Sequence, residues 1–247
     1  MKNQKFKQLV IDNKALPKLF EVTAKEDGGT RIDLFDVIDD YYGVSASAFV
    51  SALNGIKSGD IALHINSPGG DVFSARAMVA AISAHPSNIT AYIDGLAASA
   101  ASYVAMACDS VVMQAGSMMM VHCASCIVWG NSSDMNEMAG LLDKIDETIA
   151  SDYSRKTGKP AEEMLALMSA ETWMTSSEAF EYGFADKVVE NEKGKAKNTW
   201  NLAAFANAPK ALIEPDPPEQ IEEQPEPAPA GFFMSAANAN RLKLALI

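Results

Sequence analysis

A serine near the middle of the chain stands where it could act as a nucleophile. Ser99 lies in the run 95–102 (GLAASAAS), where an apolar segment turns into a predicted helix that begins with small residues. A serine in such a turn can expose its hydroxyl, and the amides at the helix start can stabilise an oxyanion. The run lacks the spacing G-x-S-x-G, and close helix packing also selects alanine and serine. The motif alone leaves both interpretations open.

Two adjacent glycines offer backbone amides of the kind that acyl transfer requires. Gly69 and Gly70 end the segment 66–70 (NSPGG), between a predicted strand and a predicted helix. Glycine adopts backbone conformations closed to other residues, and N–H groups near a helix start favour developing negative charge. A turn of this composition is also typical of ordinary loops.

His122 is the best placed of the three histidines to act as a base. It follows the apolar residues 118–121 (MMMV), at the end of a predicted strand. His64 lies inside an apolar predicted strand, which indicates a core residue or one that supports a site. His85 precedes Pro86 and is expected in an exposed loop. A single histidine after a strand is also compatible with a structural role.

Taken together, these segments resemble the Clp protease proteolytic subunit family, and most of all the Clp-like serine peptidases that phages and prophages use in head maturation. The resemblance spans residues 61–189 and rests on four segments in the family's order and spacing. They are 66–70 (NSPGG), 95–99 (GLAAS), 120–122 (MVH) and 173–186 (WMTSSEAFEYGFAD).

The resemblance implies a serine–histidine–acid triad. Ser99 matches the family's nucleophile and His122 its general base. The family has an aspartate shortly before the aromatic residue of the last segment, and Glu171 occupies that place here. A glutamate can still fix the imidazole tautomer and stabilise the imidazolium. Asp152 and Asp186 are the alternative acids.

The resemblance also implies an oxyanion hole formed by the backbone N–H groups of Gly70 and Ala100, with Gly69 supporting the turn. After its histidine the family usually has Gln-Pro, whereas this chain has Cys123 and Ala124. These two positions lead toward the substrate cleft, so cleavage preference is the property least transferable from the family.

The implied function is that of a serine endopeptidase, expected to mature phage or prophage heads by cutting capsid or scaffold proteins. Its subunits are expected to form homo-oligomeric rings, without a metal or organic cofactor. No P-loop motif occurs, so any ATPase unfoldase would be a separate partner. The alternatives are an inactive Clp-like scaffold or assembly protein, a crotonase-type acyl-CoA enzyme and a serine–lysine peptidase.

Repeated strand–helix units predict an α/β fold with a largely parallel sheet, which must position these residues. The resemblance implies a ClpP/crotonase-like arrangement in which the long helix 134–156 forms a protruding handle. Strands are expected at 32–38, 60–65, 88–93, 110–113 and 118–121, and helices at 45–56, 74–84, 97–107, 134–156 and 176–182.

Composition divides the chain into a peptidase domain (1–190), a disordered linker (191–230) and a short apolar-basic end (231–247). The linker is expected because six of the 11 prolines, interleaved with acidic residues, lie at positions 215–229. The net charge is −12, and residues 1–190 hold 25 acidic and 14 basic side chains. This acidity disfavours binding to nucleic acid or to an acidic membrane surface.

Three cysteines are too few for a secreted disulfide scaffold, and the single C-x-x-C pair (Cys123 and Cys126) lacks a second pair to complete a zinc site. No signal peptide is expected at the N-terminus. The expected location is the cytoplasm of a bacterial host or a phage prohead.

Overall fold

A central sheet with helices packed against it forms the body of the protein. The computed structural model describes residues 9–11, 13, 19–189 and 200–210. The strands are β1 (Leu19–Ala24), β2 (Thr30–Phe35), β3 (Ile61–Ser67), β4 (Ile89–Ala98), β5 (Ser110–Gln114), β6 (Met118–Val121), β7 (Thr172–Thr175) and β8 (Lys187–Val189). The helices are α2 (Ala46–Gly55), α3 (Val72–Ala84), α4 (Ala100–Met106), α5 (Ser132–Thr157), α6 (Ala161–Ser169) and α7 (Ser176–Tyr182).

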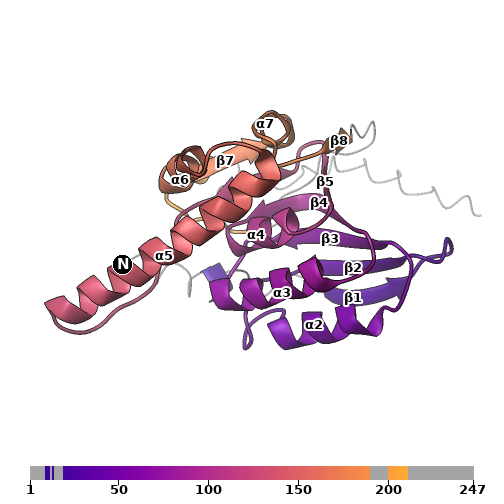
Figure 1. The fold of residues 1–247 in the computed structure, drawn as a ribbon, viewed down its shortest axis with the longest axis horizontal. Helices are drawn as coiled ribbons and strands as arrows, with labels where there is room; N and C mark the ends of the chain where they lie inside the picture. Colours follow the sequence, from indigo (N-terminus) through magenta and orange to yellow (C-terminus); the bar gives the residue numbers. More distant parts are fainter. Residues whose placement is uncertain (1–8, 12, 14–18, 190–199, 211–247) are drawn as a thin grey trace, which may run out of the picture. The chain divides into compact units, whose positions relative to one another are not determined.

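The sheet is mostly parallel, as the sequence predicts. Its strands follow the order β1-β2-β3-β4-β5-β8, and β6 branches from β4 and pairs with β7 (Figure 1). Only β1–β2 and β6–β7 are antiparallel among the described strand pairs. The predicted α/β fold is confirmed. The strands β1, β7 and β8 were not among the predicted ones.

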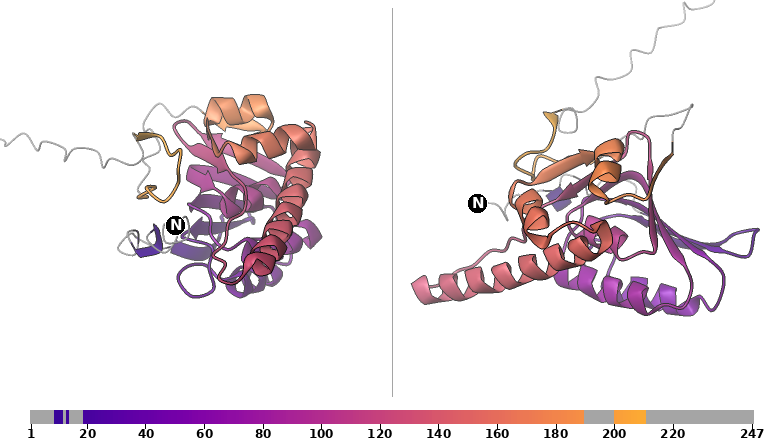
Figure 2. Two further views of the ribbon diagram at one scale, coloured as in Figure 1. Left: turned by 90° about the vertical axis from the view of Figure 1, so that its left-hand side faces the viewer. Right: turned by 45° about the horizontal axis from the view of Figure 1, so that its top comes forward.

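The main core lies between the sheet and helices α2, α3 and α4, and it extends to buried residues of α5, α6 and α7 (Figures 1 and 2). Ile61, Leu63 and Ile65 of β3 alternate along the strand and are fully buried there, next to Phe49 of α2 and Met78 of α3. Each such side chain contributes about 1.5–3 kcal/mol when it leaves water. This packing holds the strand ends that carry the candidate site.

The junction between β4 and α4 differs from the prediction. The expected end of the strand at Gly95 and the expected start of the helix at 97 are both wrong. Instead β4 continues to Ala98, because Ala97 and Ala98 pair with Met119 and Met120 of β6. Helix α4 begins at Ala100, so Ser99 alone joins the strand to the helix. Cross-strand pairing thus overrides the local preference of alanine for helix.

Helix α5 extends from the body as the predicted handle (Figure 1). Ile145 and Ile149 in its second half are buried in the core, whereas Met135 and Leu141 in its first half are exposed. An Asn131 capping box begins the helix, and Gly158 in a left-handed conformation ends it. In the part of the chain that the structure describes, no helix combines the length and hydropathy needed to cross a membrane.

Residues 200–210 fall within the segment expected to be a linker. Trp200 and Leu202 of this stretch are buried in a second apolar cluster, together with Leu9, Val37 and Met120. The predicted segment 231–247 and the remainder of the predicted linker lie outside the described residues.

Two phenylalanines near the end of the domain provide a matched test of the core. Phe184 is fully buried and lies edge-on to Tyr153 at 5.3 Å, whereas Phe180 on α7 is 53% exposed. We expect Phe184→Ala to lower the free energy of unfolding by about 3–5 kcal/mol because it leaves a cavity. Phe180→Ala should change it by no more than about 0.5 kcal/mol. Urea titrations of both variants measure the difference, and equal losses would contradict the described core.

Candidate active site

Ser99 occupies a strained turn between β4 and α4. Its backbone angles are φ 55° and ψ −122°, in a region that residues other than glycine rarely adopt. Its N–H donates to the carbonyl oxygen of Met120 at 2.9 Å, which ties the turn to β6. Such strain costs about 1–3 kcal/mol and persists only where surrounding structure holds it. The turn therefore presents the Ser99 side chain at the start of α4.

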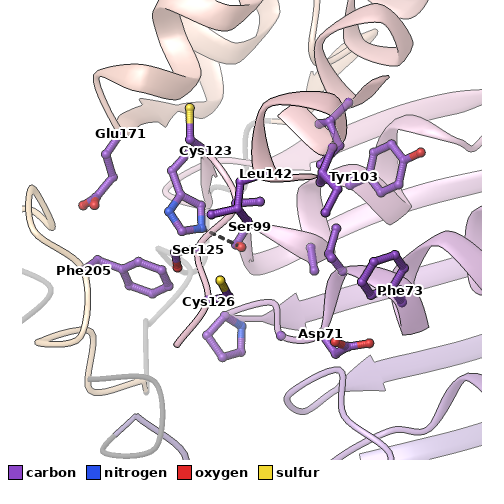
Figure 3. A pocket seen from close by; sticks show the side chains of 18 of the residues that line it. Asp71, Phe73, Ser99, Tyr103, Cys123, Ser125, Cys126, Leu142, Glu171 and Phe205 are labelled. Atoms are coloured by element: carbon purple, nitrogen blue, oxygen red, sulfur yellow. Dashed lines mark hydrogen bonds between the residues drawn. The ribbon is translucent and has the colours of Figure 1, made fainter. Parts of the chain in front are cut away.

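His122 lies next to this serine because β4 and β6 are parallel neighbours. Ala98 pairs with Met120, so Ser99 and His122 follow at the carboxyl ends of the two strands. His122 Nε2 and Ser99 Oγ are 2.7 Å apart, a hydrogen bond drawn as a dashed line in Figure 3. An imidazole with unprotonated Nε2 accepts the hydroxyl proton at this distance. The structure thus brings together two of the predicted triad residues.

The glycine turn packs directly against Ser99. Gly69 has φ 90°, and a Cβ added to it would lie 2.8 Å from both Ala100 N and Ser99 Cβ. Ile38 holds the turn in place: its N–H donates to Gly69 O, and its carbonyl accepts from the N–H that follows Gly70. The predicted oxyanion donors, Gly70 and Ala100, therefore lie at the same cavity as Ser99.

Glu171 is the candidate acid that shares this cavity with Ser99 and His122. It too has a positive φ, of 50°. Its carboxylate accepts hydrogen bonds from the backbone N–H groups of Ala206 (3.1 Å) and Asn207 (2.6 Å). The Trp173 indole N–H is a third, longer donor at 3.4 Å. Figure 3 shows Glu171 on the same side of Ser99 as Phe205.

The two alternative acids are engaged elsewhere. Asp152 accepts a hydrogen bond from the Tyr103 hydroxyl at 2.5 Å and pairs with Arg155. Burial, followed by this carboxylate, raises the pKa of Tyr103 to about 12. Asp186 accepts from the backbone N–H of Val111 at 2.7 Å. Neither aspartate lines the cavity that holds Ser99, so the geometry favours Glu171 as the acid, which stays a prediction.

The residues after His122 form one wall of the cavity, which has a volume of about 550 Å³. Asp146 holds this wall: it accepts the Ala124 N–H at 2.7 Å and a hydrogen bond from the Cys123 thiol. Burial raises the pKa of Asp146 above its ordinary value. Apolar side chains of α5 also line the cavity. They are Met138, Leu141, Leu142, Ile145 and Ile149.

Phe205 is a residue of the site that the sequence reasoning missed. Its ring lies edge-on to the His122 ring, with centroids 5.7 Å apart, and edge-on to Trp173 at 5.5 Å. Ala204 and Ala206 line the cavity beside it. This stretch was assigned to the predicted linker (191–230) because of the acidic, proline-rich composition at positions 215–229. The apolar spacing in 200–205 (WNLAAF) was the available signal for a packed segment.

The fold and this geometry define an α/β protein with a serine–histidine pair at the carboxyl ends of parallel strands. The sequence model of the Clp protease family matches residues 28–192, which is more than half of the chain. The chain belongs to that family, and the predicted resemblance is confirmed at this level.

Curated relatives agree with this assignment. The chain is 29% identical over 159 residues to the ATP-dependent Clp protease proteolytic subunit of Porphyromonas gingivalis, covering 63% of this chain and 72% of the relative. It is 29% identical over 136 residues to that of Deinococcus radiodurans, covering 54% and 67%. It is 32% identical over 134 residues to proteolytic subunit 2 of Thermobifida fusca, covering 53% and 66%.

The glycine turn can be tested by adding a single methyl group. We expect Gly69→Ala to slow the acylation of Ser99 by a fluorophosphonate by about tenfold or more, because the new Cβ displaces the turn from Ala100. Its Cβ would lie 2.4 Å from Ala98 O. The control is Gly55→Ala, where a Cβ meets nothing within 4 Å. Equal labelling rates of both variants would disprove the close approach.

The acid can be tested by isosteric replacement. We expect Glu171→Gln to slow acylation of Ser99 by about 10²- to 10⁴-fold, because an amide cannot stabilise the imidazolium as a carboxylate does. Asp152→Asn should leave the rate within about twofold, since Asp152 itself does not line the cavity and touches it through the Tyr103 hydroxyl. The measurement is the time course of fluorophosphonate labelling. The opposite ranking of the two variants would make Asp152 the acid.

Proposed function

We propose that this chain is a serine endopeptidase that hydrolyses peptide bonds by acyl transfer to Ser99. The observation that carries the proposal is the 2.7 Å hydrogen bond from the Ser99 hydroxyl to His122 Nε2, at a strained turn beside backbone amides. Membership of the Clp protease family supports the same chemistry.

The reaction begins when His122 removes the Ser99 proton as Oγ attacks the substrate carbonyl. The N–H groups of Gly70 and Ala100 donate to the oxyanion of the tetrahedral intermediate, and each such donor is typically worth about 3–4 kcal/mol. Glu171 keeps the imidazolium oriented. His122 then protonates the leaving amine, and water hydrolyses the acyl-enzyme with His122 again as base. These steps require no metal or organic cofactor.

The inferred substrates are proteins, and the inferred biological role is maturation of phage or prophage heads by cleavage of capsid or scaffold protein. This finer assignment rests on the motifs that resemble phage-encoded Clp-like peptidases. Cys123 and Ala124, which depart from the family's usual Gln-Pro, line the cavity beside the catalytic pair, so the cleavage preference is expected to differ from that of the family. The enzyme would act in the host cytoplasm or inside the prohead.

We further infer that copies of the chain associate through the exposed half of α5, as expected for ring-forming relatives. Met135 and Leu141 expose 49% and 43% of their surface on this helix, and Trp129 just before it is 97% exposed. Apolar residues gathered on a projecting element favour contact with a partner.

Intact-mass measurement over time tests the proposal, with wild type beside Ser99→Ala. We expect the wild type to cleave protein substrates and to gain one fluorophosphonate adduct per chain. Ser99→Ala should do neither, because it lacks the nucleophile. Ser83→Ala, on the exposed surface of α3, is the matched control and should behave as wild type. The same spectra reveal any self-cleavage after residue 190.

Peptidase activity that persists in Ser99→Ala would refute the mechanism. A wild type that neither cleaves nor reacts would instead favour the alternative of an inactive Clp-like scaffold protein. Binding of a CoA thioester would favour the crotonase-type alternative.

A further inference from the structure

Residues 204–206 line the catalytic cavity, and they belong to the stretch 200–208, which is far in sequence from the rest of the site. The Trp200 indole N–H donates to Asn66 Oδ1 at 3.2 Å, next to the glycine turn. Asn201 N donates to Asn13 Oδ1 at 2.7 Å. Leu202 and Ala208 are buried in the second apolar cluster. Polar and apolar anchors together fix this stretch, named here the rim segment.

The rim segment holds the carboxylate of Glu171. Ala206 N donates to one carboxylate oxygen, and Asn207 N donates to the other. The Asn207 side chain donates to Ala170 O at 2.9 Å, which ties the segment to the residue before Glu171. An ionised carboxylate has about four acceptor positions. The two amides and the longer Trp173 donor orient it and leave about one position for an imidazole.

The rim segment also contacts the histidine. Phe205 lies edge-on between the rings of His122 and Trp173, at 5.7 and 5.5 Å. Edge-to-face aromatic pairs at such distances are favourable and restrict ring rotation. One short segment therefore contacts both the candidate base and the candidate acid.

The rim segment is a wall of the cavity and does not fill it. With Phe205 in place, Gly70, Ser99, Ala100 and His122 all still line a space of about 550 Å³. The reacting atoms therefore stay accessible. This arrangement favours a supporting role over an inhibitory one.

We propose that the rim segment is a positioning element of the active site, in which the Ala206 and Asn207 amides orient Glu171 and Phe205 orients His122. The inference rests on the proposed serine peptidase function. It extends the site beyond residues 28–192, where the family match ends.

Paired substitutions in the 247-residue chain test this inference. Phe205→Ala removes the ring, and Phe205→Tyr keeps it. Ala206→Pro removes the N–H that Glu171 accepts, and Ala206→Gly keeps it. For each variant, a fluorophosphonate probe measures the rate constant of Ser99 labelling and the final number of labels per chain. Circular dichroism on heating reports folding.

We expect Phe205→Ala and Ala206→Pro to lower the rate constant by about ten- to a hundredfold, because small displacements of reacting groups are costly. Their final labelling should still reach one per chain. Phe205→Tyr and Ala206→Gly should retain rates within about threefold of wild type. Loss of structure would reduce the final labelling instead, so the two readouts separate positioning from folding.

The outcomes are distinct. The inference would be overturned if Phe205→Ala and Ala206→Pro were labelled at an unchanged or faster rate. It would also be overturned if the final number of labels per chain decreased in proportion to the rate constant. Neither result would contradict the peptidase proposal. If Ala206→Pro does not fold, the comparison of Phe205→Ala with Phe205→Tyr decides. A wild type that is not labelled at Ser99 overturns the proposed function, and this inference with it.

Discussion

The parallel pairing of β4 with β6 is the constraint on which the site depends. In this register Ala98 lies opposite Met120, so the residues that follow the two strand ends meet as Ser99 and His122. A shift of one residue would turn every side chain of one strand to the opposite face and separate the pair. Ala97 and Met119 are buried in the main core, and Ala98 and Met120 are buried in the second apolar cluster. A one-residue slip would place these side chains in the wrong cluster, where their sizes do not match the surrounding packing.

The residues with a strained backbone lie at the same candidate active site. Among the described residues, Ser99 and Glu171 are the only residues other than glycine that have a positive φ. Both line the cavity, and each is held by hydrogen bonds from distant segments. Strained residues persist where the surrounding structure overdetermines them, and they cluster at functional sites.

Local patterns predicted much of the fold for identifiable reasons. The bounds of β6 and α7 agree with the prediction, because an apolar run bounded by turns and a Thr175 capping box are local signals. The β4–α4 junction was mispredicted because alanines favour helix, whereas pairing with β6 keeps Ala97 and Ala98 in a strand. The short β7 and β8 have too few residues to show a period. The packing of residues 200–208 was not predicted, because the proline-rich, acidic stretch that follows them indicated a linker.

The sequence by itself determined the α/β class, the family resemblance and the candidates Ser99 and His122, because these depend on motifs whose residues are close in the chain. It also placed a carboxylate at position 171. Only the tertiary structure decided what surrounds that carboxylate, since its amide donors lie 35 and 36 residues away. Contacts between residues so far apart in sequence depend on the order of the strands and on loop packing. They produce no periodic pattern of residues that sequence analysis could detect. The same reason explains why Phe205 became visible as a neighbour of His122 only in the folded molecule.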